Sequence, residues 1–181
     1  MDRTRRRFVL EDALGILSRT PAALDALLRD LPTDWGDANE GGDTWSPSDV
    51  VAHLTFADRA NWVPRAKFLL EHGESRAFPE FDRSGHLSAP EQALSERLNE
   101  FAIVRRSSLQ ELAALGLSGT DLDRAGRHPA LGVVRLSQLL AAWVAHDLDH
   151  LFQISRIMAR QYTDEVGPWR QYLRIVRDAP A

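Results

Sequence analysis

Apolar side chains recur at helical spacing along most of this chain, and residues that start or stop helices separate the runs. Apolar positions three and four residues apart are typical of amphipathic helices. The predicted helices cover residues 8–17, 20–31, 46–69, 90–112, 136–160 and 162–177. No segment alternates with a period of two for long enough to require a sheet, and no internal repeat is visible. The pattern therefore predicts an all-α fold.

Polar and turn-forming residues gather between these helices. We expect loops at residues 33–44, 72–89 and 116–132, where glycines, prolines and charges replace the apolar period. Pro64 lies inside an apolar pattern that continues to Leu69, so a kink is expected there. The chain, residues 1–181, is then a single domain, a four-helix bundle with short additional helices and a frayed start over residues 1–6.

Two of the predicted helices begin at a recognisable cap. Ser46 is suited to the N-cap position, Pro47 to the first helical position, and Asp49 to the third, which makes a capping box with Asp in place of Glu. Thr20 followed by Pro21 is a second signal of the same kind. These caps fix where the helices start and hence which side chains share a face.

Composition narrows the possible functions. The 181 residues include 44% hydrophobic and 27% charged residues, with a net charge of −4, which is typical of a globular domain. An acidic chain is a poor binder of nucleic acid or of anionic membranes. There is no cysteine, so thiolate nucleophiles and cysteine metal sites are excluded. We find neither a signal peptide nor an apolar run of about 18 residues, and expect a cytoplasmic protein.

Two of the six histidines, His146 and His150, are the first candidates for metal ligands. Four residues apart on a helix, their rings project from one face, a spacing that allows both to bind one ion. The same face carries Trp143, Gln153 and Ile157, so we expect it to point into the bundle. Because an unpaired buried polar group costs about 1–3 kcal/mol, these rings need partners. The partners are either a metal ion or backbone and carboxylate groups.

His53 is the expected third ligand. It lies on the capped helix, on the face that carries Val50 and Ala57, and Asp49 one turn earlier could orient its ring. A single histidine on an apolar face is more often a satisfied core residue. With a histidine pair predicted inside the same bundle, however, three neutral imidazoles converging on one cation become the better interpretation.

A zincin interpretation of His146-Asp147-x-x-His150 is weaker. A zincin takes its third ligand downstream, but no histidine follows His150, and Asp147 is one methylene shorter than the usual glutamate base.

The order of these motifs resembles that of the DinB/YfiT-like superfamily of metal-dependent proteins. The resemblance spans nearly the whole chain. It rests on Leu31-Pro32, Thr44-Trp45-Ser46-Pro47, Asp49-Val50-Val51-Ala52-His53-Leu54, Arg127-His128-Pro129-x-Leu131-Gly132 and Leu139-Leu140-x-x-Trp143-x-x-His146-Asp147-x-x-His150-x-x-Gln153-Ile154.

This resemblance implies a four-helix bundle, often a homodimer, with one divalent ion held by His53, His146 and His150. Zinc or nickel is the implied metal, with its fourth position open to water. Relatives with known activities include transferases that use low-molecular-weight thiols and an isomerase of a small organic acid. The family therefore indicates the site more firmly than the substrate.

The leading functional hypothesis is a metal-dependent enzyme acting on a small molecule, with thiol S-transferase-like chemistry. The alternatives are a metal-dependent hydrolase, and a non-enzymatic interaction module with a structural or vestigial metal site. Candidates for catalytic roles are Asp49 and Asp149, which could orient ligand rings, Gln153, which could line the cavity, and His128, which could reach its mouth.

Overall fold

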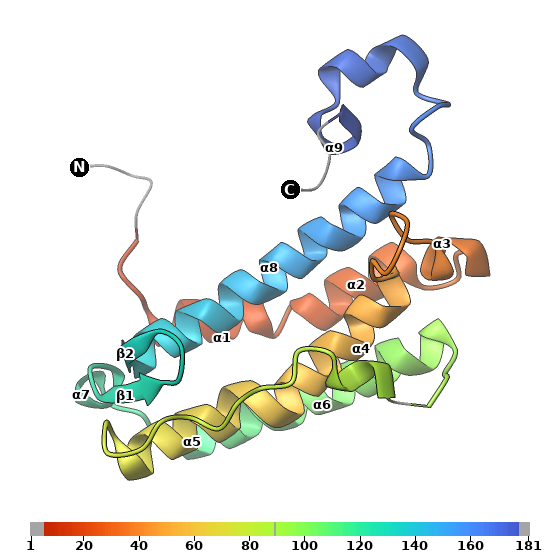
Figure 1. Cartoon of the computed structure of the whole chain (residues 1–181). Coiled ribbons are helices and arrows are strands. Elements are labelled where there is room, and N and C mark those ends of the chain that lie inside the picture. The colour runs from red at the N-terminus through yellow and green to blue at the C-terminus, as the bar shows by residue number, and fades with distance from the viewer. Residues whose placement is uncertain (1–5, 89, 178–181) are drawn as a thin grey trace.

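The computed structural model describes residues 6–88 and 90–177, so residues 1–5 of the expected frayed start lie outside the described residues. The long helices match the predicted ones, and the all-α four-helix bundle is confirmed (Figure 1). In chain order the elements are α1 (Leu10–Leu17), α2 (Thr20–Leu28), α3 (Thr33–Asp37), α4 (Pro47–Ala57), the π-helical turn η1 (Asp58–Trp62), α5 (Val63–His72), the 3-10 turn η2 (Gly85–Ser88), α6 (Leu94–Ala114), α7 (Gly119–Leu122), β1 (Ala125–His128), β2 (Gly132–Arg135), α8 (Leu136–Arg160), the 3-10 turn η3 (Gly167–Tyr172) and α9 (Arg174–Arg177).

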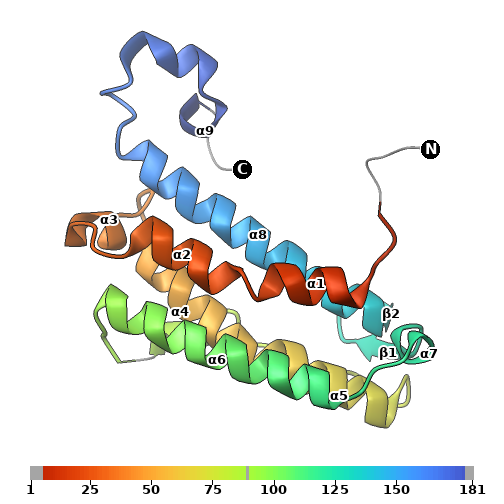
Figure 2. The same cartoon turned by 180° about the vertical axis from the view of Figure 1, so that it is seen from behind.

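Four helical rods form the bundle. The first is α1 with α2, which are nearly collinear, and the second is the continuous helix α4–η1–α5 (Figures 1 and 2). The other two are α6 and α8. The α4–η1–α5 rod packs against both α6 and α8, while α1 packs on α8 and α2 on α6. No helix within the described residues is long and apolar enough to cross a membrane.

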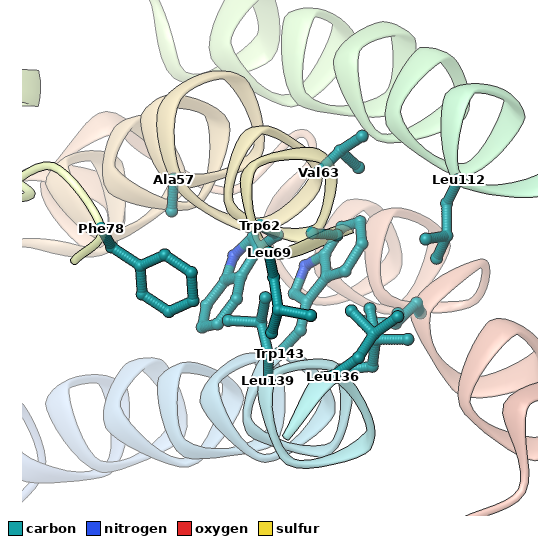
Figure 3. Packing of buried hydrophobic residues seen from close by; sticks show 12 residues of the cluster. Ala57, Trp62, Val63, Leu69, Phe78, Leu112, Leu136, Leu139 and Trp143 are labelled. Carbon is teal, nitrogen blue, oxygen red and sulfur yellow. The ribbon is translucent and has the colours of Figure 1, made fainter. Parts of the chain in front are cut away.

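The apolar core lies between these rods. Trp62 and Trp143 stack with ring centroids 5.9 Å apart and planes 8° apart, and they join the α4–η1–α5 rod to α8 (Figure 3). A second apolar cluster includes Leu24, Phe101 and Ile154, all without exposed surface. Burial of this kind is the main stabilising term for a bundle.

The helix starts agree only in part with the predictions. Ser46 caps α4 as expected: its Oγ accepts from the backbone N–H of Asp49, and the Asp49 carboxylate accepts from the backbone N–H of Ser46. Thr20, in contrast, makes no cap. Its hydroxyl donates across the bundle to Asp147, because the side chain faces the core and finds a buried carboxylate there.

Four details of the predicted loops and helix boundaries differ in the structure. The short helix α3 interrupts the predicted loop at 33–44, and α6 begins at Leu94 rather than at residue 90. A two-stranded antiparallel hairpin lies in and just beyond the predicted loop at 116–132. Strands of four residues are too short to give a clear period of two, and Gly132 with φ +72° permits the tight turn. The helix does not end near Pro64: the π turn η1 directly precedes α5, in which Pro64 is the second residue.

Candidate metal centre

Three histidine rings from two helices meet inside the bundle. Nε2 of His146 lies 3.1 Å from Nε2 of His53 and 3.2 Å from Nε2 of His150, and the three candidate ligand atoms lie within 4.8 Å of one another. His53 comes from α4, and His146 and His150 lie about halfway along α8. Nitrogens bound to one zinc ion at about 2.0–2.1 Å with tetrahedral angles lie about 3.3 Å apart. The observed spacing therefore suits one cation.

Burial keeps these rings neutral. The pKa of His53 is lowered to about 4, mainly by burial and further by the nearby His150 and His86. Burial, then the neighbouring histidines, lowers the pKa of His146 to about 3. Burial also lowers the pKa of His150, against the opposing influence of Gln153. Neutral imidazole is the form that binds a metal.

The hydrogen bonds of the rings leave lone pairs directed at the centre of the cluster. Nδ1 of His150 lies 2.8 Å from Oε1 of Gln153, and since an amide oxygen can only accept, Nδ1 carries the proton and Nε2 the lone pair. Nε2 of His146 can then donate to one neighbour or accept from one, so the three Nε2 atoms cannot all be satisfied by one another. A cation would accept all three lone pairs. The donor set thus fits a divalent metal.

A cavity of about 670 Å³ opens beside the cluster. It is lined by His53, His146 and His150 together with Trp45, Asn61, Trp62, Arg65, Glu80, Phe81, Arg83, His128, Pro129 and Ala130. A larger groove of about 870 Å³ runs between α2 and α6. No histidine lines that groove, so the metal-binding chemistry lies in the smaller cavity, which is of the size that small molecules occupy.

Comparisons with known proteins place the chain in a family. The family model of the DinB superfamily matches residues 16–154, a span that includes all three histidines. The chain belongs to the DinB superfamily. No curated protein matches its sequence.

A solved structure supports the fold of this DinB-superfamily chain. It is YfiT from Bacillus subtilis, described as a probable metal-dependent hydrolase with an unusual four-helix bundle topology. The match has 18% sequence identity and a TM-score of 0.72, and covers 89% of this chain and 92% of that one. At this identity the likeness establishes the shared fold, and the activity in that description belongs to YfiT.

A further histidine beside the cluster of this DinB-superfamily chain, His86, is buried and was not predicted as part of the site. His86 on η2 is 3% exposed, and its ring centroid lies 5.0 Å from that of His53 and 4.5 Å from that of Trp45. Neither of its ring nitrogens has a hydrogen-bond partner among the described residues. Gly85 lets η2 approach α4, since a Cβ there would lie 2.5 Å from the ring of Phe56. Gly85 is the feature of the sequence that could have indicated this close approach.

The predicted catalytic candidates fall into two groups. Gln153 contacts a cluster ring and His128 lines the cavity, where its Nδ1 accepts from the backbone N–H groups of Ala130 and Leu131. Asp49 is engaged in its cap, and Asp149 is exposed. No hydrogen bond joins either carboxylate to a cluster ring within the described residues. The orienting roles of these two carboxylates therefore stay predictions, and the cap and the exposed helix face hold them where no such contact is formed.

A second buried polar cluster lies on the neighbouring face of α8. Arg105 donates from Nε and Nη2 to Asp58, at 2.6 and 3.0 Å, and from Nη1 and Nη2 to Asp147. Its Nη1 also donates to the carbonyl of Leu17, and the indole N–H of Trp143 donates to Asp58. Asp147 therefore points away from the histidines, which excludes it as the base of a zincin-like site.

Proposed function

We propose that this DinB-superfamily protein is a metal-dependent hydrolase of a small molecule, with one divalent ion bound by His53, His146 and His150. The observation that carries the proposal is the convergence of three neutral imidazole nitrogens, which cannot satisfy one another, at the wall of a cavity of about 670 Å³. Imidazole donors suit zinc and nickel, and we propose zinc first because three histidines and an open position are typical of catalytic zinc.

A bound ion of this kind would act as a Lewis acid and lower the pKa of a water molecule to near neutrality. The chain's own residues perform the supporting steps. Gln153 holds the proton of His150 on Nδ1 and so keeps its Nε2 free to bind. Trp45 and Trp62 wall the cluster with apolar rings, which strengthens electrostatic interactions by excluding water.

His128 holds a proton where a substrate could use it. Because its Nδ1 accepts two backbone N–H groups, the neutral ring carries its proton on Nε2. We propose that this N–H donates to the substrate or to the leaving group at the mouth of the cavity.

Hydrolysis takes the place of thiol transfer as the main proposal. The neighbour of shared fold is described as a probable metal-dependent hydrolase, and no feature of the described residues favours a thiol as cosubstrate. The homodimer and the cytoplasmic location stay predictions of the sequence and its family resemblance.

The test is hydrolysis by zinc-, nickel- and cobalt-loaded protein against a panel of small esters, amides and lactones. We expect a chelator to abolish the activity, re-addition of metal to restore it, and His53→Asn to remove it. His72→Asn is the matched control, since His72 lies on the same helical rod but lines no part of the cavity. Hydrolysis that survives both the chelator and His53→Asn would refute the proposal.

A further inference from the structure

Positive side chains gather at the cavity, although the chain as a whole carries a net charge of −4. Arg65 and Arg83 line its wall, and Glu80 is the one acidic residue among its lining side chains. Within the described residues neither arginine has a carboxylate at salt-bridge distance. Arg65 is half-buried, donates from Nη2 to the carbonyl of Pro79 at 3.0 Å, and leaves its other N–H groups without a carboxylate partner.

Some other arginines of the bundle, in contrast, are paired with carboxylates. Arg59 binds Glu100, and Arg156 binds Glu40 through two hydrogen bonds. Charged groups near a concave wall attract ligands of opposite sign, and a guanidinium binds carboxylate or phosphate oxygens in a planar, two-point geometry. Two guanidiniums without a carboxylate partner at one cavity are therefore suited to an oxyanion.

His128 lines the same cavity as the two arginines. Burial, and next to it the charges of Arg65 and Arg83, lower the pKa of His128. Both guanidiniums therefore act on the same ring, whose Nε2–H adds a third donor to the wall. An anion bound there would have two positive charges and one neutral donor around it.

Two residues that line the same cavity carry buried polar atoms without a partner in the described residues. Asn61 is 6% exposed and its Oδ1 is buried without a hydrogen-bond partner, and the indole Nε1 of Trp62 is in the same state. Both residues belong to the π turn η1, and π turns frequently occur at functional sites.

We propose that the substrate carries an oxyanionic group, a carboxylate or a phosphate, held by Arg65 and Arg83 while its reacting bond lies over the histidine cluster. The inference deepens the proposed hydrolase function and rests on it for the position of the reacting bond. The anion subsite itself depends only on the arginines.

The experiment measures binding calorimetrically, on zinc-loaded and on metal-free full-length protein, with three probes: succinate, its uncharged diamide and inorganic phosphate. We expect the zinc-loaded wild type to bind succinate at least about tenfold more tightly than the diamide, since charge-assisted hydrogen bonds exceed neutral ones by about that factor. Arg83→Gln and Arg65→Gln should each weaken succinate binding about tenfold or more.

Arg76→Gln is the matched control, because Arg76 belongs to the segment that leads to Arg83 but does not line the cavity. It should leave the affinity unchanged. If phosphate binds more tightly than succinate and depends on the same two arginines, the oxyanion is a phosphate, and the opposite order identifies a carboxylate. Arg83 is exposed, so Arg83→Gln tests the subsite even if Arg65→Gln weakens folding.

The metal-free arm separates this inference from the proposed function. Anion binding that depends on both arginines in metal-free protein, alongside zinc-loaded protein without hydrolytic activity, would refute the hydrolase and keep the subsite. Equal affinity for succinate and its diamide would overturn the subsite. Unchanged anion affinity in both variants, or no binding of either anion to the wild type, would overturn it as well.

Discussion

Adjacent residues of α8 belong to two buried polar clusters that differ in how completely their atoms are bonded. Asp147 joins Asp58 and Arg105 in a cluster in which every guanidinium N–H has an acceptor. His146, one residue earlier, belongs to a cluster in which Nδ1 of His53 and of His146 is buried without a partner, and the Nε2 atoms face each other.

The difference separates structure from function. A fully satisfied network holds elements together, and here it links the first helical rod, through Leu17 and Thr20, to η1, α6 and α8. Unsatisfied buried groups cost stability and persist where a ligand completes them. On this basis we propose that the histidine cluster is the functional site and that the arginine cluster supports it.

The largest expected effect comes from breaking the satisfied cluster. Arg105→Met leaves Asp58 and Asp147 buried without their cation, which should reduce the free energy of unfolding by about 3–5 kcal/mol. For a chain of this size that corresponds to a melting temperature lower by roughly 6–20 °C. Arg106→Met, at the exposed neighbouring position, should change the free energy of unfolding by less than about 0.5 kcal/mol. Equal effects of the two would contradict the comparison.

The two clusters should also respond to pH in opposite directions. The pKa values of His53 and His146 in the folded protein are lowered to about 4 and about 3. Below pH of about 6.5, the usual pKa of histidine, the unfolded chain therefore binds protons at these two residues that the folded metal-free protein does not bind. Each histidine therefore removes stability as pH falls from about 6.5 towards 4, at up to about 1.4 kcal/mol per pH unit.

Asp58 acts the other way, because burial raises its pKa to about 6. Its contribution to stability is present at low pH and is lost as pH rises from its ordinary value through about 6. Urea unfolding of metal-free protein between pH 4 and 7 measures both. The free energy of unfolding should fall less steeply with decreasing pH in His53→Gln than in the wild type, and more steeply in Asp58→Asn. Identical slopes in the two variants would show that the clusters do not differ.

The smallest effect tests the hydrogen bond between Gln153 and the ring of His150. Gln153→Leu removes the acceptor of the His150 Nδ1–H and should weaken zinc binding by roughly 10–100-fold, as is usual for residues that support a ligand. Folding stability of the metal-free protein should change little, since Gln153 is half-buried. Competition with a chromogenic chelator measures the affinity, and Gln110→Leu, on the exposed face of α6, should leave it unchanged.

The fold and the position of the cluster could be predicted because they depend on local signals. The capping box at Ser46 and the apolar period of α8 set which faces carry His53, His146 and His150, and the structure brings those three together. Helical periodicity reports such faces directly.

The rest depends on contacts between distant segments. In the sequence, Arg105 is one of several charged positions on its helix. In the structure it is buried and binds carboxylates 47 and 42 residues away in the chain. His86 comes next to His53 through a turn of irregular backbone, and Thr20 finds a partner on α8 instead of its own helix. No periodicity in a single sequence reports these pairings.

The most direct test of the central claim is the metal content and zinc affinity of the wild type beside His53→Ala, His146→Ala and His72→Ala. The three-histidine site predicts one zinc per chain for the wild type and for His72→Ala, and a loss of zinc well beyond 100-fold in affinity for the other two. Equal zinc content and affinity in all four proteins would show that the imidazoles of residues 53, 146 and 150 do not bind the metal.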